Sequence, residues 1–189
     1  MDSSSYLAAE KLYVGTISIN DGIVDITDPC YSNDTWCARF GQKVKPGIYK
    51  CYVDIWNSPY HDSNPICKNM IRNDYRITSL TIFHKDYYDF DEGVDDDKFE
   101  ILDTNIGVDA GLCGFYNHKP DFKEDKDWDK FWQNLSNLKE YCVTCDTILG
   151  NGVTVSSGWG DGCYPLYKLE DNEGEIYALQ LRFDEEVEE

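Results

Sequence analysis

The sequence predicts an α+β fold that is mainly antiparallel β, built as a sandwich or an open barrel with one long amphipathic helix packed on a sheet. Three observations lead to this prediction. Apolar and polar residues alternate in at least five short segments, as they do in half-buried strands. A single segment repeats its apolar residues every three or four positions over several turns, which is the helical pattern. Aromatic residues make up 14% of the chain, and Tyr and Phe favour pleated surfaces.

The expected strands occur in both halves of the chain. The first two surround the turn Asn20–Gly22, and we expect them to pair as a β-hairpin because alternation continues on both sides of the turn. Another turn is expected at Pro46-Gly47. The expected strands are Lys11–Asn20, Gly22–Thr27, Ile48–Trp56, Asp74–His84, two short strands within Lys98–Tyr116, then Val153–Ser156, Cys163–Leu169 and Glu175–Phe183, the last two joined by a turn at Asp171–Gly174.

Glu124–Cys142 is the expected long helix. Its apolar residues form one stripe, which we expect to face the core rather than a partner. Asn57–Arg72, with two Pro and several Asn and Ser, is expected to be a long loop, and the acidic stretch Asp86–Asp97 a solvated one. We expect one domain over residues 1–189, with flexible ends at 1–10 and 184–189, because no linker divides the chain.

Ser32–Gly41 is expected to contain a short helix. Asn33 or Asp34 can cap its start, and Gly41 can end it. Trp36 and Phe40 are four residues apart, so in a helix they would share one face.

The charge of the chain is its most unusual property. Seventeen Lys and Arg face 36 Asp and Glu, a formal net charge of −19. Such a chain repels nucleic acid and anionic membranes, so we expect it to bind neither directly, and it attracts basic proteins or metal cations. Alternatively, the negative net charge serves only to keep the protein soluble. The first residues resemble no secretion signal and no segment is long and apolar enough to span a membrane, so a cytoplasmic location is expected.

Several familiar catalytic and binding motifs are absent from the sequence. There is no P-loop, no dinucleotide-binding glycine motif and no His-Glu-x-x-His, and we expect no cofactor. The eight Cys are expected to be reduced thiols, mostly in the core. Cys142-x-x-Cys145 lacks the second pair that a zinc ribbon needs. Asp86–Asp97 lacks Gly at the sixth position of an EF-hand loop, so calcium binding there is not expected.

The candidate binding site is centred on the glycine-rich stretch SSGWGDGCYPLY. Glycines at alternate positions let the backbone adopt positive φ and allow close approach of another group, so the loop would fix one ring and one carboxylate in place. Two further Asp, in TDPCY and GVDAG, stand in similar turn-rich contexts. The candidate ligand- or partner-binding residues are Trp159, Gly160, Asp161, Gly162, Tyr164, Asp109 and Asp28.

Two roles remain open for Asp28, Asp109 and Asp161. Each carboxylate can brace its own turn by accepting backbone N–H groups, or the three can share a metal or ligand site. The residue types alone leave metal binding undecided, and no catalytic residues are assigned.

These three segments also carry a family resemblance. TDPCY, GVDAGLCGFY and SGWGDGCYPLY, with a closing hairpin that ends in ALQLRF, are similar to a group of bacteriophage proteins within the wider bacterial and phage family called domain of unknown function 4241. The similarity extends from about Ile17 to Phe183. It implies a mostly β fold and a phage or mobile-element setting. The family pattern often has an Asp shortly after the second motif, but this chain has Asn117 at that position. This difference argues against a metal site that uses this position.

Together these features predict a non-enzymatic, acidic interaction protein. It would bind a host protein with a basic surface, for example a defence protein, and inhibit it or act as a decoy. One alternative is a small-molecule binder, such as a sponge for a signalling nucleotide, that stacks its ligand on Trp159. The other is a metal-dependent hydrolase that uses Asp28, Asp109 and Asp161. The oligomeric state is left open.

Overall fold

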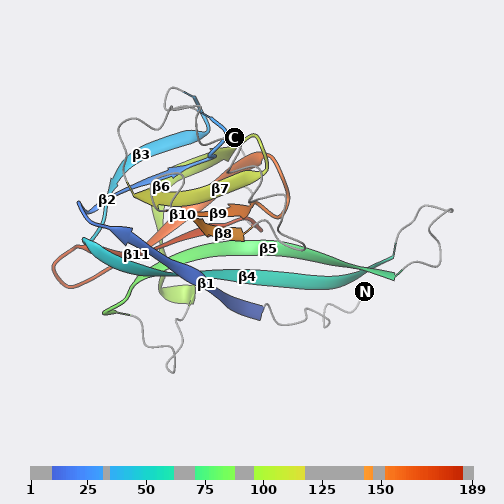
Figure 1. Cartoon of the computed structure of the whole chain (residues 1–189), viewed down its shortest axis with the longest axis horizontal. Helices are drawn as coiled ribbons and strands as arrows, with labels where there is room; N and C mark the ends of the chain where they lie inside the picture. Colours follow the sequence, from blue (N-terminus) through green and yellow to red (C-terminus); the bar gives the residue numbers. More distant parts are fainter. Residues whose placement is uncertain are drawn as a thin grey trace.

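Two antiparallel sheets form the described part of the protein (Figure 1). The structure is a computed structural model of the chain, and it describes residues 10–31, 35–61, 71–87, 96–117, 143–146 and 152–184. One sheet has the strand order β1-β4-β5-β11-β10-β6, and the other β3-β2-β7-β9-β8. The strands are β1 (Glu10–Ile19), β2 (Ile23–Thr27), β3 (Ala38–Lys43), β4 (Gly47–His61), β5 (Ile71–His84), β6 (Glu100–Val108), β7 (Leu112–Asn117), β8 (Val143–Asp146), β9 (Gly152–Ser156), β10 (Gly162–Glu170) and β11 (Ile176–Arg182).

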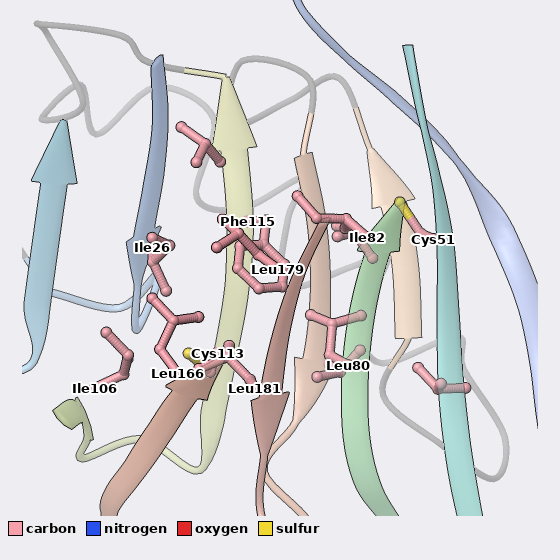
Figure 2. Close-up of a cluster of buried hydrophobic side chains, with 14 of the residues drawn as sticks. Ile26, Cys51, Leu80, Ile82, Ile106, Cys113, Phe115, Leu166, Leu179 and Leu181 are labelled. Atoms are coloured by element: carbon pink, nitrogen blue, oxygen red, sulfur yellow. The ribbon is translucent and has the colours of Figure 1, made fainter. Parts of the chain in front are cut away.

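The main hydrophobic core lies between the two sheets, which makes the arrangement a sandwich. Alternate residues of each strand point inward, as a pleated strand with one buried face requires. Figure 2 shows side chains from strands of both sheets filling this space. The six-stranded sheet contributes Cys51, Leu80, Ile82, Ile106, Leu166, Leu179 and Leu181, and the five-stranded sheet contributes Ile26, Cys113 and Phe115. The predicted mainly antiparallel β architecture is therefore confirmed.

A smaller hydrophobic cluster lies on the other face of the six-stranded sheet. Its buried members are Tyr52, Phe83, Phe99, Leu169 and Ala178. Tyr52 stands between the inward-facing Cys51 and Val53 in β4, so its side chain points away from the sandwich core.

The predicted hairpin around Asn20–Gly22 is wrong, although the turn itself is present. Gly22 has φ +68°, as a tight turn requires, but β1 pairs with β4 while β2 pairs with β3 and β7. The chain therefore passes from one sheet to the other at this turn. This arrangement lets the apolar faces of β1 and β2 enter one core from opposite sheets, whereas a hairpin would keep them in the same sheet.

The predicted short helix within Ser32–Gly41 is also wrong. Residues 38–43 form β3, which pairs with β2 from Thr27↔Ala38 to Ile23↔Lys43. Gly41 does adopt a positive φ of 75°, but at the irregularity in this ladder, where its N–H donates to the buried carboxylate of Asp25. Pairing with β2 and this hydrogen bond outweigh the local capping pattern.

The predicted loop Asn57–Arg72 is wrong at both of its ends. β4 continues to His61 and β5 starts at Ile71, and the two pair from Tyr49↔His84 to His61↔Ile71 (Figure 1). β1 pairs with β4 only as far as Ile55, so among the described strands β5 alone pairs with the last part of β4. Proline lacks a backbone N–H, and a strand edge tolerates it; among the described strands, no second strand pairs with this part of β4, which contains Pro59.

The remaining expectations divide between confirmed strands and segments that the structure does not describe. β9, β10 and β11 occupy the expected positions, and Gly174 in the turn between the last two has φ +79°. The expected helix over 124–142 lies outside the described residues, as do Cys142 and residues 88–95 of the acidic stretch. The described part contains one short 3₁₀ turn, Asp96–Lys98, and no α-helix. No helix in it is long and apolar enough to cross a membrane.

Candidate functional site: the motif end of the sandwich

Three loops that carry the sequence motifs meet at one end of the sandwich, which we call the motif end. They are the segment Asp28–Tyr31 after β2, the turn Asp109–Gly111 between β6 and β7, and the loop Ser157–Asp161 between β9 and β10. The turn and the loop both carry the chain between the two sheets. They lie side by side because β6 pairs with β10 and β7 pairs with β9 up to this end. The Ser157 N–H donates to the Gly111 carbonyl over 3.0 Å.

Asp28 joins two of these segments with a fully buried carboxylate. Its Oδ1 accepts the Cys30 N–H at 2.9 Å, and its Oδ2 accepts the N–H groups of Asp109 and Ala110 at 3.0 and 2.7 Å. A buried carboxylate with several N–H donors is stabilised in place, whereas one without partners would be costly. Asp28 therefore braces the motif end, including a turn distant in sequence, which extends the predicted bracing role.

Asp109 and Asp161 lie at the surface of the same end. The Tyr31 hydroxyl donates to Asp109 Oδ2, and this hydrogen bond, more than any other factor, raises the pKa of Tyr31 to about 12. Asp161 is exposed, and Gly162 after it starts β10 by pairing with Val108. The described residues contain no group of three His, Cys, Asp or Glu side chains that could hold a metal ion.

The thiols around Asp28 are held in their neutral form. Burial, followed by the Asp28 charge, raises the pKa of Cys30 to about 12. Burial likewise raises the pKa values of Cys37 and Cys113. Because the thiolate is the nucleophilic form, these cysteines are poorly suited to covalent catalysis near neutral pH. Cys30, Cys37, Cys113 and Cys163 are free thiols, and Cys37, Cys51 and Cys113 are fully buried.

The glycine-rich loop is held in shape by hydrogen bonds to its own carbonyl groups. Ser157 Oγ and the Tyr164 hydroxyl both donate to the Gly160 carbonyl, and Arg76 Nη1 donates to the Gly158 carbonyl at 3.2 Å. Gly158 and Gly160 have φ of +67° and +97°. The prediction that this loop needs glycine for positive φ is confirmed.

Trp159, at the tip of this loop, is 45% exposed and lies beside a cavity of about 350 Å³. The Arg76 guanidinium carbon is 5.4 Å from the centre of its ring, and Trp56 packs at 6.5 Å. The cavity is lined by Trp159, Asp161, Tyr164, Phe183 and Asp184. Three of the predicted site residues, Trp159, Asp161 and Tyr164, thus share one cavity. Asp28 and Asp109 are not among its lining residues.

Several residues of the motif end could not be assigned from the sequence. Trp36 was expected to share a helix face with Phe40, but it lies outside any helix and is 62% exposed, with its ring packed on the backbone of Gly107 in β6. Tyr31 lies within the TDPCY motif, so the sequence could have identified it as a residue of this site. Arg76 is in β5, far from every motif in sequence, and nothing local marks it.

The fold and the motif end define a two-sheet β-sandwich protein whose loops between the sheets present tryptophan and carboxylate side chains at one end. The chain belongs to the family described as protein of unknown function (DUF4241), whose family model matches residues 17–181. No curated protein and no solved structure matches the chain.

Proposed function

We propose that this chain is a non-enzymatic, acidic interaction protein that binds a basic surface of another protein through the motif end. The observation that carries the proposal is the exposure of Trp36 and Trp159, at 62% and 45%, together with the exposed Asp109 and Asp161 at that end. Tryptophan is enriched among the residues that dominate binding energy at protein interfaces. Carboxylates beside such anchors select a partner of opposite charge.

The fixed geometry of these loops supports the same proposal. The Asp28 carboxylate holds the Asp109–Ala110 backbone, and Arg76 holds the Gly158 carbonyl. Side chains that are already ordered lose less conformational entropy on binding, so more of the contact energy becomes affinity. The net charge of −19 would also raise the rate of encounter with a basic partner.

The setting that we propose is a bacteriophage or another mobile element acting in the host cytoplasm. The motif resemblance supports this setting. There the protein would bind a host protein, such as a defence factor, and inhibit it or act as a decoy. Catalysis is not required for this role, and the neutral thiols and the hydrogen-bonded Asp28 carboxylate are consistent with it.

The test is an affinity capture from host lysate with three matched baits: wild type, the double variant Trp36→Ala/Trp159→Ala, and Tyr13→Ala. Tyr13 is 51% exposed in β1, at the opposite edge of the six-stranded sheet from β6. We expect a basic host protein that is captured by wild type and by Tyr13→Ala and lost with the double variant. Equal capture by all three baits would contradict the proposal.

A small-molecule binder is the second candidate, favoured by the cavity beside Trp159. A nucleotide suits this cavity poorly, because Asp161 and Asp184 would face its phosphates. Native mass spectrometry of freshly purified protein would detect a carried ligand. The metal-dependent hydrolase remains the third candidate. A rise of several degrees in the melting temperature with magnesium, calcium or manganese, abolished in Asp161→Asn, would favour it over the interaction protein.

A further inference from the structure

We propose that the cavity beside Trp159 binds one arginine side chain of the partner protein. This inference rests on the proposed function and names the group that the motif end recognises. The cavity has a volume of about 350 Å³ and is lined by Trp159, Asp161, Tyr164, Phe183 and Asp184. It thus combines aromatic rings with two carboxylates. A volume at the lower end of the usual range for ligand sites suits a side chain better than a large ligand.

The chemistry of this lining favours a cation. Aromatic faces attract cations through the ring quadrupole, and a carboxylate attracts them through its full charge. Asp161 is exposed and has no hydrogen bond or ion pair with any described residue. Its oxygens are therefore available to donors from a ligand. An anion would meet two negative charges at the same place.

A guanidinium group fits this combination better than an ammonium group. It is planar, so it can stack on a ring while its N–H groups form a fork to one carboxylate. Trp159 already makes a cation–π contact with an arginine within the chain, because the Arg76 guanidinium carbon lies 5.4 Å from its ring centre. Arg76 carries one positive charge near the loop, whereas Asp161 and Asp184 together carry two negative charges.

The test uses an acetyl-Gly-Arg-Gly-amide peptide and the same peptide with citrulline, which keeps the shape of arginine without its charge. Binding is followed by NMR through the indole N–H resonance of Trp159, assigned with Trp159→Phe. We expect saturable binding of the arginine peptide and roughly tenfold weaker binding of the citrulline peptide, the effect of losing one charge-assisted pair. A lysine peptide should bind more weakly than the arginine peptide.

Two variants make the assignment specific to the cavity. Asp161→Asn keeps the side-chain shape and should weaken arginine binding about tenfold. Glu173→Gln removes the same charge from the exposed turn between β10 and β11 and should leave binding unchanged. Melting curves establish that both variants are folded.

The other results overturn either the inference or the proposed function on which it rests. Equal binding of the arginine and citrulline peptides would exclude charge recognition. Tighter binding of tetramethylammonium than of the arginine peptide would indicate a site for a free organic cation instead. If the peptide fails to bind while Trp36→Ala/Trp159→Ala still abolishes partner capture, the cavity assignment fails and the proposed function stands. If the peptide binds but capture is unaffected, the proposed function fails instead.

Discussion

At the scale of single residues, the motif end depends on carboxylates in two different roles. Asp28 is buried and saturated by backbone N–H groups, whereas Asp161 is exposed beside a cavity. Both stand in glycine- or proline-rich turns in the sequence, yet burial and backbone hydrogen bonds separate the bracing residue from the candidate binding residue. Variants at the two positions should therefore affect different properties.

Replacing Asp28 should destabilise the fold. Asp28→Ala leaves three backbone N–H groups without their acceptor, and we expect a loss of about 3 kcal/mol or more in the free energy of unfolding. Asp28→Asn keeps one oxygen and should lose less. Urea unfolding measures both, and Glu173→Gln, an exposed control, should stay within about 0.5 kcal/mol of wild type. A loss below about 1 kcal/mol in Asp28→Ala would refute the bracing role.

Tyr31 should titrate at unusually high pH. Its hydrogen bond to Asp109 stabilises the neutral phenol and raises its pKa from 10 to about 12. Because the folded state favours the protonated form, this contribution to stability is complete below about pH 10 and is lost as the pH rises toward about 12. The ¹³Cζ shift of labelled tyrosine reports the titration. Asp109→Asn should lower this pKa, and Asp161→Asn should not change it.

At the scale of elements, the β9–β10 loop combines two different requirements for glycine. A Cβ at Gly158 would lie 2.2 Å from the Ile77 carbonyl oxygen, so both its positive φ and the available space demand glycine. A Cβ at Gly160 would meet nothing within 4 Å, so only its φ of +97° demands glycine. The close approach of Gly158 to the Ile77 backbone allows the loop to pack against β5.

The two glycines should therefore differ in their sensitivity to alanine. Gly160→Ala should cost about 1 kcal/mol from backbone strain alone. Gly158→Ala should cost clearly more, about 3 kcal/mol, because the β5 backbone must also move. Thermal or urea unfolding compares them. Gly160→Asn should be milder than Gly160→Ala, since Asn tolerates positive φ. Equal losses at positions 158 and 160 would contradict the close packing on Ile77.

At the scale of the whole molecule, the fold buries phenol and thiol groups under a strongly acidic surface. Tyr49, Tyr116 and Cys113 are buried, and burial is the main reason why their pKa values are raised. The folded state therefore tolerates these groups only in their protonated forms. The exterior has a large excess of carboxylates, because most of the chain's 36 acidic residues against 17 basic ones are too costly to bury.

The buried groups predict unfolding at high pH. Their protonated forms are favoured in the folded state, so stability is unaffected by them below about pH 9 and falls as the pH rises above the ordinary values of thiols and phenols. Circular dichroism at equilibrium, from pH 7 to 12, should show loss of the fold together with ionisation of the buried tyrosines. Ionisation of all 14 Tyr near pH 10 with the fold intact would disprove this prediction.

The acidic surface predicts salt-dependent association with the partner. Added salt screens surface charges over about 8 Å at physiological ionic strength. The association rate should therefore fall as salt rises, by more than the dissociation rate increases. Surface plasmon resonance at several salt concentrations measures both rates. An association rate that is insensitive to salt would show that the net charge of −19 serves solubility only.

Local patterns in the sequence predict where most strands lie and which segments carry the candidate site. Alternation with period two depends only on one face of a strand being buried, so it marked β1, β2, β5 and β9 to β11 without knowledge of their partners. The motifs around Asp28, Asp109 and Trp159 were found for a similar reason. Positive φ and sharp turns restrict residue type locally.

Which strands pair, and which carboxylate is buried, depends instead on packing between distant segments. The separation of β1 from β2 depends on how two sheets share a core, and the strand at residues 38–43 depends on its ladder with β2. The exposure of Trp36 follows from that same strand. Asp28 acquires its partners in the turn between β6 and β7, and Trp159 its contact with Arg76, across 81 or more residues of chain. These choices depend on burial and hydrogen bonding between distant segments, which no local pattern of residues encodes.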